Sequence, residues 1–367
     1  MSDSSDLGLS QSTTDFEMQD PKHRASNQPC PSGHPCAARP PAAVSWLKGE
    51  HMRRSRLLTL LLGATLMMSL AAASPATATY PDHNGLIAFG VETDQGFQLF
   101  TVRSGGAGLH QITHVKGDAV HPDWSPDGRW IVFELGHPEG QPFCSVILMR
   151  ADGTDMRDLT GDRHGCEGQP SFTPDSRHIV FGRFNEITEV EAIWIMNLAG
   201  GDRHEITRGI GSGVTDPNVS PDGTTVSFVA FNGRELGQAL YTVHLDGSHL
   251  RKLTPFRTDV AIKQDWAPNG RRLVFTDNAD NVDRSANIAT IRPDGTGLRY
   301  LTHLDGPEER AYAGGYAPNG FWIVFRLEDH GEFGLFRMRP NGTGVEPILA
   351  PTDFAPRFID WGSSPQA

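Results

Sequence analysis

One short pattern recurs along this chain at nearly constant spacing, and it limits the possible folds more than any other feature. An aromatic or apolar residue precedes a tight turn of the SPDG type, and a β-rich run such as WIVF follows the turn. The intervals between successive copies are 48, 47, 47, 50 and 45 residues, measured at Trp124, Phe172, Val219, Trp266, Tyr316 and Trp361. A period of about 40 to 50 residues with several short strands is typical of the blades of a β-propeller.

The residues of each turn suit a type I turn. The turns are SPDG (125–128), TPDS (173–176), SPDG (220–223), APNG (267–270) and APNG (317–320). Pro sets φ at the second position, Asp or Asn suits the third, and Gly accepts a positive φ at the fourth. This turn is predicted to join the first and second strands of a blade. A DGT-type turn before each LT joins the third and fourth. Asp127, Asp222 and Asp294 are therefore predicted to be turn residues rather than catalytic ones.

The two ends of the repeat region are incomplete in complementary ways. Ahead of Trp124, the runs at 84–90, 96–102 and 109–113 supply a second, third and fourth strand without a first. The run APRFIDWG (355–362) supplies a first strand with no blade after it. Pairing the two would close the ring and protect the strand edges. We therefore predict an all-β, six-bladed propeller that residues 355–362 close by joining the blade begun at Gly85.

An inner strand ending in W-S-P-D-G, followed by I-V-F and a later D-G-T…L-T, resembles the repeats of the TolB-type propeller family, also called PD40 or WD40-like repeats. The resemblance covers about residues 82–362. The WD-repeat family is less similar, because no G-H…W-D pair brackets each unit. The resemblance implies a rigid ring, but a fold by itself does not determine a function. Trp124, Trp266 and Trp361 share one repeat position and are predicted to pack between blades.

The residues ahead of the repeats have a different character. Residues 1–51 are rich in Ser, Pro, Asp and Gln and are predicted to form a disordered extension, with Met1 or Met52 as the start. Residues 52–78 combine three arginines, an apolar run and a terminal ATA, which is typical of a signal peptide. The apolar run is shorter than the roughly 20 residues of a membrane span. We expect residues 79–367 to form the propeller and to be exported to the periplasm or the cell exterior.

Two cysteines, Cys144 and Cys166, lie in the predicted propeller. In an exported protein such a pair is a candidate disulfide. The predicted topology places Cys144 at the start of the third strand of one blade and Cys166 in the loop that leads into the next. Both then lie on one face of the ring, and we predict that they are bonded. The crosslink would be worth roughly 3 kcal/mol in the chain-entropy account.

The predicted propeller contains no G-x-S-x-G, H-E-x-x-H, C-x-x-C or G-x-x-x-x-G-K-[ST] motif. The net charge of −12 argues against a nucleic-acid partner. Loops between the second and third strands share a face with the loops between blades, and variable loops on a rigid scaffold usually carry function. We therefore predict a binding site at the channel mouth on this loop-bearing face. Its residues are His121, Glu167, Gln169, Asp216, Lys263 and Arg357. Asp216 and Lys263 are expected to contact solvent.

These observations favour a non-catalytic, monomeric scaffold that binds a protein, a peptide or a component of the cell envelope. It would bind no nucleic acid, would contact the membrane only through its signal segment, and would need no cofactor. The alternative is a hydrolase or lyase acting on carbohydrate or peptide, with His121, Glu167, Asp216 and Lys263 at the channel mouth. A transition metal near His121 and a calcium ion held by channel aspartates and carbonyl groups stay open as alternatives.

Overall fold

The computed structural model describes residues 84–137, 144–161, 165–185, 190–208, 213–231, 237–278, 285–306, 308–352 and 354–365. All of them belong to the second of two compact units, Ala71–Ala367. The predicted extension and signal peptide lie outside the described residues. Within the described ranges the chain is all-β: its helical segment is one 3-10 turn, Phe256–Thr258, and no helix is long and apolar enough to span a membrane.

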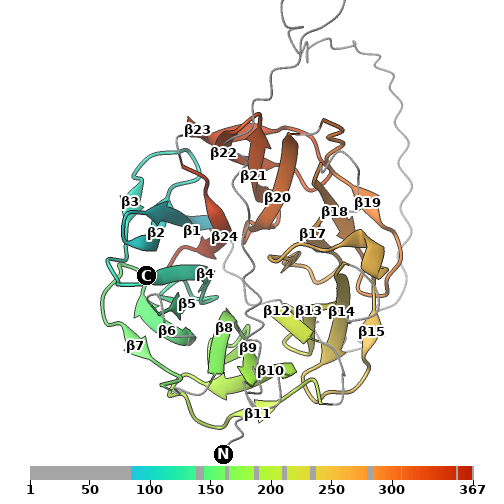
Figure 1. Ribbon diagram of the computed structural model, residues 1–367. Helices are drawn as coiled ribbons and strands as arrows, with labels where there is room; N and C mark the ends of the chain where they lie inside the picture. The colour runs from blue at the N-terminus through green and yellow to red at the C-terminus, as the bar shows by residue number, and fades with distance from the viewer. Residues whose placement is uncertain are drawn as a thin grey trace, which may run out of the picture. The chain divides into compact units, whose positions relative to one another are not determined.

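The strands form a β-propeller, with four-stranded blades around a central axis (Figure 1). Each blade is named here by its innermost strand. The β4 blade contains β4 (Asp118–Trp124), β5 (Trp130–Gly136), β6 (Cys144–Arg150) and β7 (Arg157–Asp158). The β8 blade contains β8 (Gly165–Phe172), β9 (His178–Asn185), β10 (Val190–Asn197) and β11 (His204–Glu205). One parallel pairing, between Cys144 and Cys166, joins these two blades into a single eight-stranded sheet.

The remaining blades are separate four-stranded sheets. The β12 blade contains β12 (Gly213–Val219), β13 (Thr225–Phe231), β14 (Ala239–His244) and β15 (Arg251–Lys252). The β16 blade contains β16 (Asp265–Trp266), β17 (Leu273–Asp277), β18 (Asn287–Ile291) and β19 (Arg299–Tyr300). The β20 blade contains β20 (Glu309–Tyr316), β21 (Ile323–Asp329), β22 (Glu332–Met338) and β23 (Glu346–Thr352).

The β24 blade combines the two ends of the described chain. Its order is β24 (Arg357–Ser363), β1 (Asn84–Thr93), β2 (Gly96–Val102) and β3 (His110–Gln111). Strands β24 and β1 are antiparallel, with Ile87 opposite Trp361 and Asn84 opposite Ser363. In Figure 1 the red β24 lies directly beside the blue β1. The inner position of this blade is thus filled from the C-terminal part of the chain.

The SPDG turns form because their side chains make hydrogen bonds to one another and to the backbone N–H groups of the turn. Ser125 Oγ donates to Asp127 Oδ1 at 2.6 Å, and the same carboxylate oxygen accepts the Arg129 N–H at 3.1 Å. Gly128 has a φ of 69°, a conformation that glycine adopts at little cost. Asp222 accepts the Ser220 hydroxyl and the Thr224 N–H in the same way. The assignment of these aspartates to turns is therefore confirmed.

The hydrophobic core lies between neighbouring blades. The phenylalanine of each IVF-type run is at most 1% exposed, at Phe89, Phe133, Phe181, Phe228, Phe275 and Phe325. Burying one such ring contributes roughly 1.5 to 3 kcal/mol. Trp124 packs with Ala88 and Leu99 of the preceding blade, and Trp266 packs in the same way on Val229 and Leu240. The predicted packing of the repeat tryptophans between blades is confirmed.

Candidate functional site

The inner strands turn the predicted mouth residues toward the axis through a repeated backbone irregularity. The position three before a landmark residue has left-handed φ in five of the six cases, and Ala313 before Tyr316 is the exception. The five are His121 (51°), Gln169 (50°), Asp216 (53°), Lys263 (83°) and Phe358 (54°). Strand register shifts at this position in β4, β8, β12 and β24, as it does in a β-bulge. A bulge re-aims a side chain, and positive φ is uncommon for residues other than glycine. The ring is therefore built at a conformational cost.

Lys263 crosses the centre of the ring. Its Nζ lies 3.4 Å from the carbonyl oxygen of Pro122 in the β4 blade and 3.9 Å from Asp360 Oδ1 in the β24 blade. The Lys263 backbone N–H donates to Asp216 Oδ2 at 2.7 Å, which ties the β16 blade to the β12 blade. One residue therefore contacts three other blades. Lys263 is 8% exposed and Asp216 is 7% exposed, so the expectation that both contact solvent was wrong.

Aspartates one position before the landmark residues connect adjacent blades. Asp360 Oδ2 accepts the Trp124 N–H at 2.8 Å, and Asp123 Oδ2 accepts the Phe172 N–H at 2.8 Å. Asp265 Oδ2 accepts the Tyr316 N–H at 2.6 Å. A carboxylate that accepts a backbone N–H forms a stronger bond than a neutral acceptor does. These side chains are therefore part of the ring's own framework.

The inner aspartates also surround Lys263 electrostatically. Burial raises the pKa of Asp123 well above its usual value, and the charge of Asp360 raises it further. Burial and then Asp360 raise the pKa of Asp265 to about 7. Burial likewise raises the pKa of Asp216. For Lys263 the surrounding carboxylates outweigh burial, which alone would lower the value, and its pKa is raised. Lys263 therefore keeps its charge, while Asp123, Asp216 and Asp265 are held more easily in the protonated form than a free aspartate is.

His121 lies beside the channel in the β4 blade. Its Nδ1 is 3.0 Å from Glu134 Oε2, and its ring lies 4.1 Å from the Phe358 ring, centroid to centroid. Glu134 Oε2 also accepts the Gln169 N–H at 3.0 Å. The Nε2 atom of His121 is buried and makes no hydrogen bond within the described part of the chain. His121 and Gln169 are therefore brought together through Glu134, a second-strand residue that the sequence analysis did not select.

Gln169 continues the same chain of contacts into the β12 blade. Its Oε1 accepts the Asp216 N–H at 2.7 Å and is also bonded to the Thr215 hydroxyl. Thr215 in turn bonds to Glu191, and burial raises the pKa of Glu191 to about 7. The polar atoms of these residues are used largely to connect blades. Glu191 was missed because it lies on a third strand, where no repeat position marks it.

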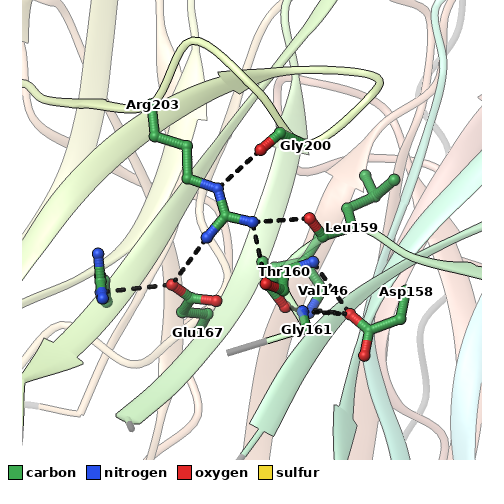
Figure 2. Close-up of polar contacts among 9 residues, drawn as sticks. Val146, Asp158, Leu159, Thr160, Gly161, Glu167, Gly200 and Arg203 are labelled. Atoms are coloured by element: carbon green, nitrogen blue, oxygen red, sulfur yellow. Dashed lines mark hydrogen bonds and ion pairs between the residues drawn. The ribbon is translucent and has the colours of Figure 1, made fainter. Parts of the chain in front are cut away.

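Glu167, predicted as a ligand-binding residue at the mouth, is 1% exposed. Its Oε1 lies 3.3 Å from Arg183 Nε and 3.5 Å from Arg203 Nη1. Figure 2 shows Arg203 between Glu167 and the carbonyl oxygens of the neighbouring blade. Arg203 Nη2 donates to the Leu159 carbonyl at 2.7 Å and to the Thr160 carbonyl at 3.0 Å. Glu167 thus pairs with two arginines of its own blade, and Arg203 connects that blade to the β4 blade through the Leu159 and Thr160 carbonyls.

Arg357, the first residue of β24, is half-buried on the loop-bearing face. Its guanidinium lies over the Phe97 ring, 5.6 Å from the centroid. The described residues provide no ion-pair partner for it, unlike the carboxylate-bound arginines elsewhere in the ring. Of the predicted mouth residues, Arg357 therefore keeps its polar atoms most accessible to a ligand.

A small cavity lies on the side of the SPDG turns. A cavity of about 40 Å³ is lined by the inner aspartates, by Trp124 and Trp361, and by turn prolines such as Pro126. At roughly 10 to 15 Å³ for each water, this holds about three water molecules. A substrate the size of a sugar or a dipeptide does not fit in that space.

The Sγ atoms of Cys144 and Cys166 are bonded, and the two Cα atoms lie 4.4 Å apart. Glu134 lies near both sulfur atoms, and the three residues form the one cluster of close metal-ligand atoms in the described ranges. A disulfide lacks the thiolate that binds a metal. This cluster therefore does not make a metal centre, and its sulfur atoms serve as a covalent link between the β4 and β8 blades.

Comparison with known proteins identifies the repeat. Residues 144–364 match the family model described as the TolB beta propeller domain. A Tol-Pal system protein TolB of Francisella tularensis is 32% identical over 239 residues, which cover 53% of this chain and 54% of that protein. An uncharacterized protein of Agrobacterium fabrum is 27% identical over 159 residues, covering 41% of this chain and 53% of that one. The chain thus spans about half the length of the curated relatives it matches.

Among solved structures, TolB from Acinetobacter baumannii superposes with a TM-score of 0.61 at 17% identity. The alignment covers 77% of this chain and 67% of that one. At such low identity the likeness concerns the fold, and it agrees with the arrangement of blades in Figure 1.

Proposed function

This chain belongs to the TolB β-propeller domain family, and from that membership we propose that it is an exported, non-catalytic, monomeric scaffold. It binds a protein, a peptide or another component of the cell envelope through its loop-bearing face, in the periplasm or outside the cell. It uses no cofactor and binds no nucleic acid.

One observation carries the proposal: the polar residues around the channel are used to hold blades together. Asp123, Asp265 and Asp360 accept backbone N–H groups of the next blade, and Lys263 spans the axis. Charged groups that form a site for chemistry normally converge on a space that a substrate can enter. Here they converge on Lys263, beside a cavity of about 40 Å³. A rigid ring of this kind is suited to presenting its loop-bearing face to a partner.

The enzyme alternative has less support from the same residues. It requires His121, Glu167, Asp216 and Lys263 to act on one substrate. Glu167 is paired with Arg183 and points toward a blade boundary, and Asp216 accepts two backbone N–H groups of the β16 blade. Neither carboxylate is placed where a proton could be exchanged with a ligand at the mouth.

The proposed scaffold is a six-bladed ring closed by β24. The support is the antiparallel register of β24 with β1, which places Trp361 opposite Ile87. Trp361 also packs with Ala317 and Val324 of the β20 blade. Export is supported by the Cys144–Cys166 disulfide, a bond typical of oxidising compartments.

The loop-bearing face also offers apolar side chains for a partner. Phe184 at the end of β9, Phe231 at the end of β13, and Ile262 before β16 are 38%, 40% and 40% exposed. They come from three consecutive blades. Exposed aromatic residues are frequent among those that contribute most to protein–protein binding. We propose that these three residues supply the apolar contact of the partner surface.

A pull-down from envelope extracts with the full chain as bait tests this proposal. The double variant Phe184→Ala/Phe231→Ala should lose most of the captured partner. The matched control is Leu250→Ala/Leu298→Ala on the turn-bearing face, where the side chains are 46% and 49% exposed. Circular dichroism would first establish that both variants are folded. Loss of the partner from the control, with retention by the loop-face variant, would place the binding surface on the opposite face.

A further inference from the structure

Two arginines and three aromatic rings meet at the boundary between the β20 and β24 blades, and we name these five residues the arginine notch. The Arg326 guanidinium lies over the Tyr312 ring, 4.2 Å from its centroid, and 6.0 Å from that of Phe333. The Arg357 guanidinium lies over the Phe97 ring. Stacking fixes a flat guanidinium and leaves the donors on its edge available. The notch is at the loop-bearing face, since Arg357 begins β24 and Arg326 lies toward the β21–β22 connection.

The boundary differs from the others because its inner strand has no polar side chains at the usual positions. Ala313 and Gly315 of β20 stand where the β16 blade has Lys263 and Asp265. The carboxylate that would accept a backbone N–H of β24 is therefore missing from this position. No inner aspartate of β20 is present to neutralise the arginines of the notch.

The notch carries more positive than negative charge. Within the described ranges, its nearest carboxylate is Glu328, which lies 2.9 Å from Arg310 Nη1 and 3.8 Å from Arg326 Nη2. Glu328 is thus bound mainly by Arg310 and only weakly by Arg326. The Nε–H of Arg326 is buried and has no acceptor in the described part of the chain. Within the described part of the chain, Arg326 therefore has a carboxylate only at 3.8 Å, and Arg357 makes no ion pair.

The surroundings of Arg326 disfavour its positive charge, so that a bound anion would stabilise it. Burial lowers the pKa of the Arg326 guanidinium, and the charge of Arg357 lowers it further, against the opposite effects of Tyr312 and Glu328. A buried donor without an acceptor destabilises the molecule, and in native structures such a donor is usually explained by a water, an ion or a ligand.

We propose that the arginine notch binds a carboxylate group of a peptide. A carboxylate matches the planar fork of a guanidinium and can accept two parallel N–H bonds from it. Phe97 and Phe333 would contact the apolar atoms next to that carboxylate. A polyanion fits less well, because Glu134, Glu191 and Asp216 lie across the same mouth. This inference rests on the proposed function and identifies the chemistry of the partner's contact.

Isothermal titration of the full chain with small probes tests the inference. The first probe is acetyl-phenylalanyl-glycine with a free C-terminal carboxylate, and the second is the same peptide as its amide. The third is acetyl-phenylalanyl-glutamic acid α-amide, in which only the side-chain carboxylate is free, and the fourth is inorganic phosphate. We expect at least tenfold weaker binding of the amide than of the free acid, and the third probe shows whether a side-chain carboxylate serves equally. Equal binding of acid and amide, or tighter binding of phosphate, would overturn the inference.

Variants connect the titration to the notch. Arg357→Gln should weaken the acid probe at least tenfold, and Arg357→Lys, which keeps the charge but loses the fork, should lie between. Arg339→Gln is the matched control, because its guanidinium stacks on Trp322, 3.8 Å from the ring centroid, away from the notch. If Arg326→Gln does not fold, the half-exposed Arg357 variants decide the result. Equal weakening by Arg339→Gln and Arg357→Gln would contradict the assignment.

The pull-down separates this inference from the proposed function. A wild-type chain that captures no envelope component overturns the proposed function, whereas the peptide titration still tests the notch. If Arg357→Gln loses the acid probe but retains the whole captured partner, the partner does not use a carboxylate at the notch. That result overturns the inference and leaves the scaffold function intact.

Discussion

Two sets of aspartates occupy different positions of the same repeat, and their environments shift the pKa of the side chain in opposite directions. The turn aspartates, such as Asp222, accept hydroxyl and backbone hydrogen bonds at the surface, and these bonds lower the pKa of Asp222 although partial burial opposes them. The channel aspartates, such as Asp265, also accept a backbone N–H, yet burial and a neighbouring carboxylate raise the pKa of Asp265 to about 7. Hydrogen bonds determine the direction of the pKa shift at the surface, whereas desolvation determines it in the buried channel.

The comparison matters for function because an aspartate in a turn and an aspartate in the channel are both candidates for a catalytic residue. A raised pKa in a cleft is a common sign of an active site, but buried structural networks produce it too. In this ring the channel aspartates surround Lys263 and hold neighbouring blades. The difference between the two sets therefore indicates framework in the channel rather than chemistry.

The largest expected loss of stability comes from removing the positive charge of Lys263 in the channel. Lys263→Met leaves Asp123, Asp216, Asp265 and Asp360 without their shared counter-charge, and breaking a buried ion pair in this way costs about 3 to 5 kcal/mol. The loss should be smaller at pH 5 than at pH 8, because protonation of the carboxylates relieves their repulsion. Urea unfolding at both pH values measures it.

The control for this variant is Arg271→Met in the turn of the same blade, where the side chain is exposed. Its effect should stay within about 0.5 kcal/mol. If Lys263→Met proved as mild as Arg271→Met at pH 8, the ring of carboxylates would not depend on Lys263.

An intermediate effect is expected from Asp265→Asn. The pKa of Asp265 is raised from 3.8 to about 7, so its contribution to stability is fully present below about pH 4 and is lost as pH rises through 7. At pH 8 the neutral amide should therefore stabilise the protein, by about 1 to 4 kcal/mol. At pH 5 the gain should be smaller than at pH 8, because the Asp265 carboxyl is ionised in the unfolded chain but still protonated in the folded one, and only the first part of the loss between pH 4 and pH 7 has occurred. Denaturant midpoints at the two pH values measure the difference.

Asp222→Asn provides the opposite case for the same experiment. The pKa of Asp222 is lowered, so its contribution is present above its unfolded pKa and is lost as pH falls through the folded value. Its substitution should therefore destabilise the protein at pH 8 as well as at pH 5. A stabilising effect of Asp222→Asn at pH 8 would remove the distinction between the two sets.

The smallest effect is expected from Asp222→Ala, which removes the turn hydrogen bonds to Ser220 and Thr224. We expect a loss of about 1 kcal/mol, because these bonds are near the surface and water replaces them in part. Thermal melting monitored by circular dichroism is sufficient to measure this loss of stability. A loss as large as that of Lys263→Met would show that the turn, too, is an essential part of the ring.

The sequence was sufficient for features that depend on local patterns. The strand runs, the SPDG turns and the packing of Trp124 between blades all follow from residues close together in the chain. The family resemblance was also recognisable from those motifs. Burial of Lys263 was not predictable in the same way, since it depends on Pro122, 141 positions away in the chain. One further signal is present in the sequence: an aspartate precedes Trp124, Trp266 and Trp361, and this recurrence indicates the contacts that these aspartates make between blades.

The mouth residues show why the rest could not be derived. Glu167 and Gln169 are two positions apart on β8, yet one pairs with Arg203 at a blade boundary and the other bonds to Asp216 beside the channel. Such a division depends on the bulge at Gln169 and on where side chains of other blades end. The bulge recurs with the repeat, but the spacing of the repeats does not show which side chains of other blades reach Glu167 and Gln169.

Hydrogen–deuterium exchange of the full chain, alone and with the partner captured from envelope extracts, tests the scaffold account most directly. The account predicts that binding protects the ends of strands on the loop-bearing face, as at residues 229–231 and 357–359. The SPDG turns at 125–128 and 220–223 should exchange as they do in the free protein. Protection of those turns, with unchanged exchange at 229–231 and 357–359, would contradict the account.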